Sequence, residues 1–148
     1  MFEWFKRWRS ARPLPINATL PAHLKVGKIG ENAAARFYAK NGFTILYRNI
    51  RIGKSELDII AESKEFIVFC EVKTRVQKEE KIHFDHTRPA LAVDKEKRDN
   101  LIVGARHFAQ KYQKKGKSFR FDVVEVYLRE DLSVLDLCHM RSAFTLDR

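Results

Sequence analysis

Two apolar segments that each carry acids constrain this chain more than any other feature. Residues 56–62 and 66–73 are rich in β-branched and aromatic side chains, which predicts two antiparallel strands joined by a turn at residues 63–65. Asp58 and Glu71 lie within these apolar runs. Burying an ionised carboxylate without a partner is costly, so we expect each to pair with a cation, to bind a metal or to change its pKa.

The rest of the pattern predicts one α/β domain over residues 23–148, preceded by a basic, aromatic and Pro-punctuated tail over residues 1–22. Whether the tail docks on its own domain, stays free, or touches a partner or a membrane surface is left open. The expected elements are a helix over 26–40, strands over 43–52, 56–62 and 66–73 forming a meander, a loop over 74–94, a helix over 95–115, and strands over 119–128 and 132–137.

Charge points to a polyanionic partner. The formal net charge is +10, and Lys and Arg that neutralise phosphates gain affinity by releasing counterions. The alternative is a generally basic soluble protein. No apolar run approaches the roughly 20 residues that span a bilayer, and charged residues interrupt the apolar N-terminus before a secretory signal can form. We therefore expect a cytoplasmic protein without a membrane span.

The acids and a nearby lysine suggest metal-dependent chemistry. In a strand, alternate side chains share a face about 7 Å apart, so Glu71 and Lys73 point the same way, and Asp58 joins them if the strands are in register. Two carboxylates and the Val72 carbonyl offer the oxygen ligands that Mg²⁺ or Mn²⁺ prefers. With Lys73 stabilising negative charge, such a set suits phosphodiester hydrolysis. The alternative is a structural Glu-x-Lys ion pair.

Other charged residues are weighed against simpler roles. Glu31 lies near the start of the first predicted helix, where its simplest role is a favourable interaction with the helix N-terminus. Asp122 is expected to form a structural salt bridge. The spacing of His83, Asp85 and His86 does not suit a zinc site, and no organic cofactor is expected. The exposed face of the second helix carries Lys97, Arg98, Arg106, Lys111, Lys114 and Lys115.

Four ordered motifs resemble the YraN-like family of small bacterial proteins. They are Gly27-x-x-Gly30-Glu31, Glu56-Leu57-Asp58-Ile59-Ile60-Ala61, Glu71-Val72-Lys73-Thr74-Arg75 and Arg120-Phe121-Asp122-Val123-Val124. The family is similar to archaeal Holliday-junction resolvases and belongs with the PD-(D/E)xK nucleases. The resemblance implies a restriction-endonuclease-like fold, with a central mixed β-sheet flanked by helices.

The same resemblance assigns roles within the motifs. It implies metal ligation by Asp58 and Glu71, a catalytic lysine at Lys73, and a helix acid at Glu31 that completes the site. Ser55 stands where the family usually has glycine, which leaves the role of Glu56 open. DNA contacts are expected from Arg75, Lys97, Arg98, Arg106 and Lys111.

Two functions from different classes follow. The first is a metal-dependent endonuclease acting on branched or single-stranded DNA, for which a two-fold dimer is the expected assembly because cutting two strands calls for two sites. The second is a non-catalytic nucleic-acid-binding protein with a nuclease fold. Converging acids favour the first, since they repel phosphate unless a cation intervenes.

Overall fold

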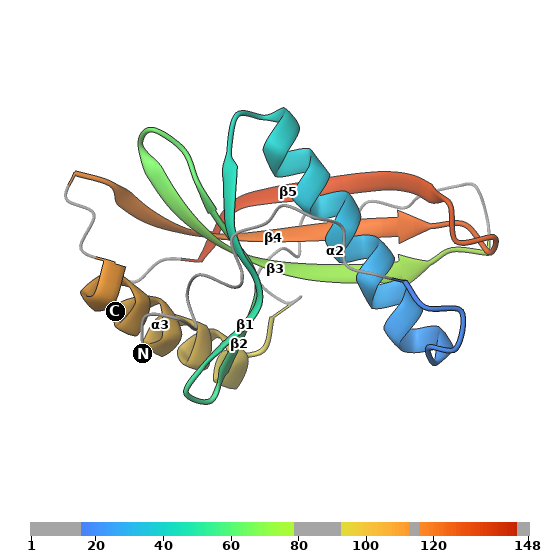
Figure 1. Cartoon of the computed structure of the whole chain (residues 1–148), viewed down its shortest axis with the longest axis horizontal. Helices are drawn as coiled ribbons and strands as arrows, with labels where there is room; N and C mark the ends of the chain where they lie inside the picture. Colours follow the sequence, from blue (N-terminus) through green and yellow to red (C-terminus); the bar gives the residue numbers. More distant parts are fainter. Residues whose placement is uncertain (1–15, 79–92, 113–115, 145–148) are drawn as a thin grey trace.

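The computed structural model of this chain describes residues 16–78, 93–112 and 116–144. This part holds two helices and five strands, which makes it an α/β structure (Figure 1). Residues 1–15 of the predicted tail and residues 79–92 of the predicted loop, which hold its histidines, lie outside the described residues, as do Lys114 and Lys115 of the second predicted helix. The elements are α2 (Ala22–Lys40), β1 (Thr44–Ile52), β2 (Ser55–Glu62), β3 (Phe66–Val76), α3 (Lys95–Tyr112), β4 (Ser118–Leu128) and β5 (Val134–Phe144).

The five strands form one mixed sheet in the order β1-β2-β3-β4-β5. Strands β1, β2 and β3 pair antiparallel, which confirms the predicted meander. Strands β3 and β4 pair in parallel, and β4 pairs antiparallel with β5. A parallel pair needs a crossover connection, and α3 lies within the segment that joins β3 to β4.

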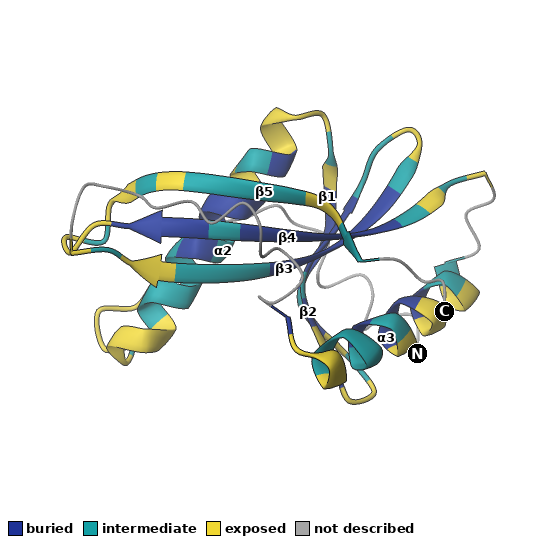
Figure 2. Ribbon diagram, turned by 180° about the vertical axis from the view of Figure 1, so that it is seen from behind, coloured by how far each residue is buried: buried dark blue, intermediate teal, exposed yellow. Residues whose placement is uncertain are grey.

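The two helices cover opposite faces of the sheet. Ala34 and Tyr38 of α2 pack with Val68 and Cys70 of β3 in one apolar cluster. Phe108 of α3 packs in the other cluster, with the alternate β3 residues. Figure 2 shows β4 buried along most of its length between β3 and β5, as expected for a strand covered on both sides. No helix in the described part is long and apolar enough to cross a membrane.

Three element boundaries differ from the sequence predictions. Helix α2 begins at Ala22, directly after Pro21, so Gly27 and Gly30 lie inside the helix and do not mark its start. Strand β3 continues to Val76, since its backbone stays paired with β4 that far. Strand β5 extends to residue 144 although its end is weakly patterned, because it is an edge strand of mixed burial. Element boundaries are therefore set here by pairing and packing more than by local pattern.

Strands β2 and β3 part within the sheet. Their pairing runs from Glu62–Ile67 to Ile59–Cys70 and ends there, whereas β1–β2 and β3–β4 continue well beyond this point. The next residues are Asp58 on β2 and Glu71 on β3. We call this point, defined by these two residues, the acidic fork. In Figure 1 the β1–β2 hairpin turns away from β3–β5 and reaches toward α3.

Candidate active site

Asp58 lies across the acidic fork from β3. Its Oδ2 accepts a hydrogen bond of 2.8 Å from the backbone N–H of Val72. The carboxylate thus satisfies a backbone donor just beyond the last β2–β3 pair. This bond fixes Asp58 beside the strand that carries Glu71, as the sequence predicted for a neighbouring strand in register.

Glu71 is buried, with 3% of its surface exposed, and it binds two lysines through one oxygen. Its Oε1 accepts from Lys73 Nζ at 3.0 Å and also from Lys97 Nζ. Its other oxygen, Oε2, is buried and has no hydrogen-bond partner among the described residues. An unsatisfied buried carboxylate oxygen is costly, so this atom marks a position where a further cation or donor would be favourable.

The two carboxylates at the acidic fork repel one another. Burial raises the pKa of Asp58, and the charge of Glu71 raises it further, to about 8, against the lowering effect of the Val72 N–H. A carboxyl group with such a pKa is largely protonated at neutral pH. The two lysines bound to Glu71 therefore do not offset the cost of ionising Asp58 at this position.

A third acid approaches the fork from α2. Gly30 allows this helix to lie close to β3, since a Cβ at that position would come within 1.8 Å of the Thr74 hydroxyl oxygen. The next residue, Glu31, accepts a 2.7 Å hydrogen bond from Asn49 Nδ2, and its charge helps to raise the pKa of Asp58. Burial in turn raises the pKa of Glu31. Because α2 starts at Ala22, the predicted interaction of Glu31 with a helix N-terminus is wrong.

Lys97 is brought to the fork by α3. Gly104 lets this helix lie against β2, because a Cβ there would come within 2.8 Å of the Ser55 side chain. The Ser55 hydroxyl donates to the Asn100 carbonyl and ties the hairpin to α3. Burial lowers the pKa of Lys97, but the hydrogen bond to Glu71 and the charges of Glu71, Asp58 and Glu56 together outweigh that effect and raise the pKa overall. Ser55 thus holds the helix that carries Lys97.

The other residues predicted to contact DNA form no ion pair with Asp58 or Glu71 in the described part of the chain. Arg98 is half-buried, and Arg106 and Lys111 are exposed on α3. Arg75 is exposed at the end of β3, where it forms an ion pair of 3.5 Å with Glu125. The structure therefore brings only Lys97 of the five predicted DNA-contacting residues to Glu71.

Glu56, whose role the sequence left open, is exposed at the rim of the fork. It lines a cavity of about 270 Å³ together with Lys97 and Asp94. Its charge raises the pKa of both Glu31 and Lys97. Glu56 therefore adds negative charge near the site from a position in contact with solvent.

The residues at the fork fit a divalent cation. Among the described residues there is no cluster of three or more His, Cys, Asp or Glu side chains suited to a metal, so the predicted set remains Asp58, Glu71 and the Val72 carbonyl. Two observations support the fit: the unpartnered Oε2 of Glu71 and the raised pKa of Asp58. Carboxylate and carbonyl oxygens are also the donors that Mg²⁺ and Mn²⁺ prefer.

Sequence reasoning missed two features of this site. Asn49 lies between the Arg48–Ile59 and Ile50–Leu57 pairs, opposite Asp58, and adopts a left-handed φ of 47°. An asparagine in the middle of an apolar strand is unfavourable and was the available signal. The contact of Lys97 with Glu71 had no local signal, because it joins residues 26 positions apart.

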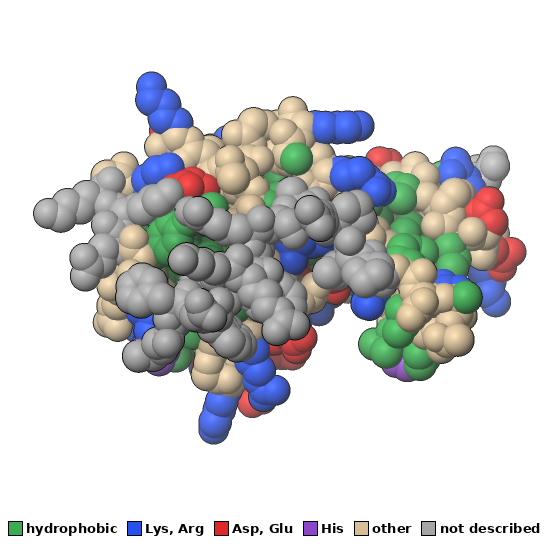
Figure 3. Space-filling view, in the orientation of Figure 1, with side chains coloured by type: hydrophobic (Ala, Val, Ile, Leu, Met, Phe, Trp, Pro, Cys, Tyr) green, Lys and Arg blue, Asp and Glu red, His purple; other side chains and the backbone are tan. Residues whose placement is uncertain are grey.

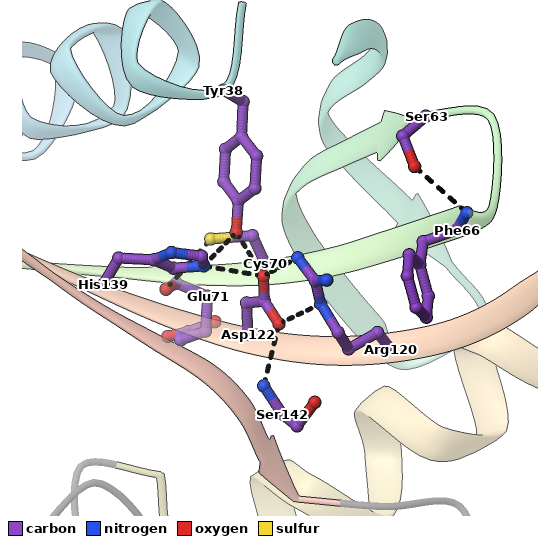
Figure 4. Close-up of polar contacts among 9 residues, drawn as sticks. All are labelled: Tyr38, Ser63, Phe66, Cys70, Glu71, Arg120, Asp122, His139 and Ser142. Carbon is purple, nitrogen blue, oxygen red and sulfur yellow. Dashed lines mark hydrogen bonds and ion pairs between the residues drawn. The ribbon is translucent and has the colours of Figure 1, made fainter. Parts of the chain in front are cut away.

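Asp122 belongs to a separate buried network on β4 (Figure 4). Both of its oxygens accept from Arg120, at 2.8 Å each, which confirms the predicted salt bridge. Tyr38 and His139 also contact it at 2.8 Å, and the Ser142 N–H donates at 3.0 Å. Although burial raises the pKa of Asp122, these bonds lower it to about 2. This carboxylate is fully compensated within the chain.

A family model and individual relatives assign this chain to the same protein family. The model of "Uncharacterised protein family UPF0102" matches residues 30–126, a range that spans all four motifs except the start of the first. A protein of this family from Caldicellulosiruptor saccharolyticus is 38% identical over 81% of this chain and 97% of its own length. Another, from Koribacter versatilis, is 40% identical over 85% of this chain and 83% of its own. A third, from Desulforapulum autotrophicum, is 37% identical over 83% and 95%.

Proposed function

This chain belongs to the family described as "Uncharacterised protein family UPF0102", and from the geometry of its acidic fork we propose that it is a metal-dependent DNA endonuclease. The observation that carries the proposal is the pair formed by the half-buried Asp58 and the buried Glu71, which lies where two strands part and keeps one carboxylate oxygen without a partner among the described residues. The mixed sheet is compatible with a restriction-endonuclease-like fold, which is part of the proposal.

Asp58, Glu71 and the Val72 carbonyl would hold Mg²⁺ or Mn²⁺. When bound, such a cation polarises a phosphoryl oxygen and lowers the pKa of a water molecule. The Val72 N–H orients Asp58, and Lys97 orients Glu71 from the side of α3. These two contacts keep the carboxylates in place before any ligand arrives, and this preorganisation is what a charged site needs.

Lys73 is placed to act on substrate. Its ammonium lies 3.0 Å from Glu71 Oε1, and 32% of its side chain is exposed. It therefore reaches both the acid pair and solvent, where it can stabilise negative charge that develops on a phosphate. Glu31, bonded to Asn49, supplies a further carboxylate near Asp58 that can accept a proton.

The charge of the chain supports a nucleic-acid substrate. A net charge of +10 favours association with phosphates, and Arg106 and Lys111 are exposed on α3. Lys and Arg side chains project from several separate places on the face shown in Figure 3. Contacts made from separate places suit a ligand with spaced phosphates.

The test is a cleavage panel. Purified protein is incubated with Holliday junctions, flaps, single strands and duplexes, with Mg²⁺ and with Mn²⁺, beside Asp58→Asn and Lys73→Ala. We expect a nick or cut in at least one structure, lost in both variants while DNA binding persists. Asp136→Asn and Lys40→Ala, at exposed positions on β5 and at the end of α2, are matched controls that should retain cleavage.

One observation favours the alternative of a non-catalytic nucleic-acid-binding protein. Lys73 and Lys97 already compensate Glu71 without a metal. Under that alternative every DNA structure survives with both metals, while binding remains and weakens steeply as salt increases. Intact substrates across the whole panel would therefore replace the endonuclease proposal with this one.

A further inference from the structure

A second cavity lies beside Phe66, at the start of β3. It has a volume of about 520 Å³, is open to solvent, and is lined by the end of α2, the β2–β3 turn and parts of β4 and β5. We call it the aromatic cavity; its wall includes Phe37, Phe43, Phe66, Arg120, His139 and Arg141. Phe66 and Glu71 are five residues apart on β3, roughly 17 Å at about 3.3 Å per residue, so the cavity is not part of the acidic fork.

One part of its wall is rigidly built. Arg120 is 6% exposed and forms a two-bond ion pair with Asp122. Its guanidinium carbon Cζ lies over two rings, 4.9 Å from the centre of Phe66 and 5.7 Å from that of Phe43. Because its position is fixed before any ligand binds, little conformational entropy would be lost on binding.

The other side of the cavity presents further rings. In Figure 4, His139 and Phe66 lie on opposite sides of the Asp122–Arg120 pair. The His139 ring is 5.0 Å from that of Phe37, and its Nε2 is held by Asp122. Phe37, Phe43 and Phe66 are all half-buried. Flat, partly exposed rings around a cavity are suited to stacking a planar ligand.

The mouth of the cavity is positive. Arg141 is exposed, with Cζ 5.4 Å from the centre of the Phe66 ring, and Lys64 is exposed in the β2–β3 turn. Neither has an ion-pair partner among the described residues, whereas Arg120 is balanced by Asp122. Glu65 is the one acid in the cavity wall. Two uncompensated cations against one carboxylate favour an anionic ligand and disfavour a metal ion.

The lining therefore combines aromatic rings with two cations at the mouth, and the simplest ligands would contact only the rings or only the cations. An inorganic anion would use Arg141 and Lys64 and leave the rings empty, and an apolar group would leave the cations unused. A nucleoside monophosphate unit uses both, with its base among the rings and its phosphate at the mouth. The volume lies within the range of about 300–1,000 Å³ typical of small-ligand sites.

We propose that the aromatic cavity binds a nucleoside monophosphate unit, either as a free nucleotide or as one nucleotide of a strand. Arg141 and Lys64 hold the phosphate, and Phe37, Phe43 and Phe66 surround the base. The assignment rests on the chemistry of this cavity and does not require that the acidic fork cuts DNA.

The experiment is a titration followed by ¹⁵N NMR of the full chain. The probes are deoxyadenosine monophosphate, deoxyadenosine, inorganic phosphate and a short deoxyadenosine oligonucleotide. We expect the monophosphate to shift amide signals of residues 63–66 and 139–141, and Arg141→Ala to weaken its binding about tenfold, the typical effect of losing one charge-assisted contact. Arg51→Ala, another exposed arginine, on β1, should bind as the wild type does.

The probes separate the outcomes. Tighter binding of the oligonucleotide than of the monophosphate assigns the site to a strand, and the reverse assigns it to a free nucleotide. Phosphate or deoxyadenosine binding as tightly as the monophosphate, shifts located elsewhere, or no shifts at all would overturn the proposal. Asp58→Asn should bind the monophosphate normally, so failure of this proposal is distinguishable from failure of the nuclease proposal.

Discussion

Replacing Asp58 by asparagine should stabilise the metal-free protein at alkaline pH. The folded state raises the pKa of this carboxyl from 3.8 to about 8, first through burial and then through the charge of Glu71. Above the unfolded pKa the unfolded chain therefore releases a proton that the folded chain retains. Stability is lost as pH rises from about 4 to about 8, and a neutral asparagine at this position would not carry that loss.

The magnitude follows from the size of the shift. Four pH units correspond to at most about 5–6 kcal/mol, at about 1.36 kcal/mol per unit. Asp58 is only partly buried by surface exposure, so solvent reduces the effect, and we expect about 1–3 kcal/mol. Asparagine keeps an oxygen that can accept from Val72 N–H, so the existing hydrogen bond is retained.

The assay is urea denaturation in the presence of a chelator at pH 5 and pH 8. The stability of Asp58→Asn minus that of the wild type should increase between the two pH values, while the same difference for Asp136→Asn should stay constant. A variant that is destabilised at pH 8, or a difference that does not change with pH, would show that Asp58 is compensated in the folded chain. The reasoning about a strained acid pair would then fail.

Two further perturbations test the neighbouring charges. Lys97→Gln should lower the melting temperature of the metal-free protein by about 4 °C, for a loss of about 1 kcal/mol. It should also enlarge the increase in melting temperature that Mn²⁺ causes, because an ammonium no longer competes for Glu71. Calorimetry that finds the same Mn²⁺-dependent increase in both proteins would contradict this. Asp122→Asn should lower the free energy of unfolding by about 3–5 kcal/mol in urea denaturation at pH 7, because it leaves the buried Arg120 uncompensated. In the wild type, the stabilisation by the ionised Asp122 carboxylate is present above about pH 4 and disappears as the pH falls toward about 2.

The sequence predicted the strands and the residues that carry charge better than it predicted their contacts. The β-branched and aromatic content of residues 56–62 and 66–73 predicted β2 and β3, and the Asp122 ion pair followed from an acid in a predicted strand. The sequence predicts that the first helix starts at residue 26, because glycine disfavours helices, but α2 starts at Ala22. Gly30 is accommodated inside the helix because it allows a close approach to β3. Such packing depends on residues distant in sequence, so local patterns do not contain it.

The fork itself could not be read from the chain for the same reason. Each acid is visible in its strand, but the parting of β2 from β3 depends on how α3 packs against the hairpin through Gly104 and Ser55. The position of Lys97 follows from that packing. A lysine on a basic helix was therefore expected to contact phosphate, although the structure places its ammonium on Glu71.

Asp122, which is buried, and Asp58, which is half-buried, differ in how far the chain compensates their charge. Asp122 receives five contacts from four residues, and its pKa falls to about 2. Asp58 accepts a hydrogen bond from a backbone N–H and lies beside a second carboxylate, and its pKa rises to about 8. The same sheet is thus able to compensate a carboxylate completely but does not do so at the acidic fork. A charge left unbalanced in this way destabilises the fold unless a cation binds, which is why the fork is the place to look for function.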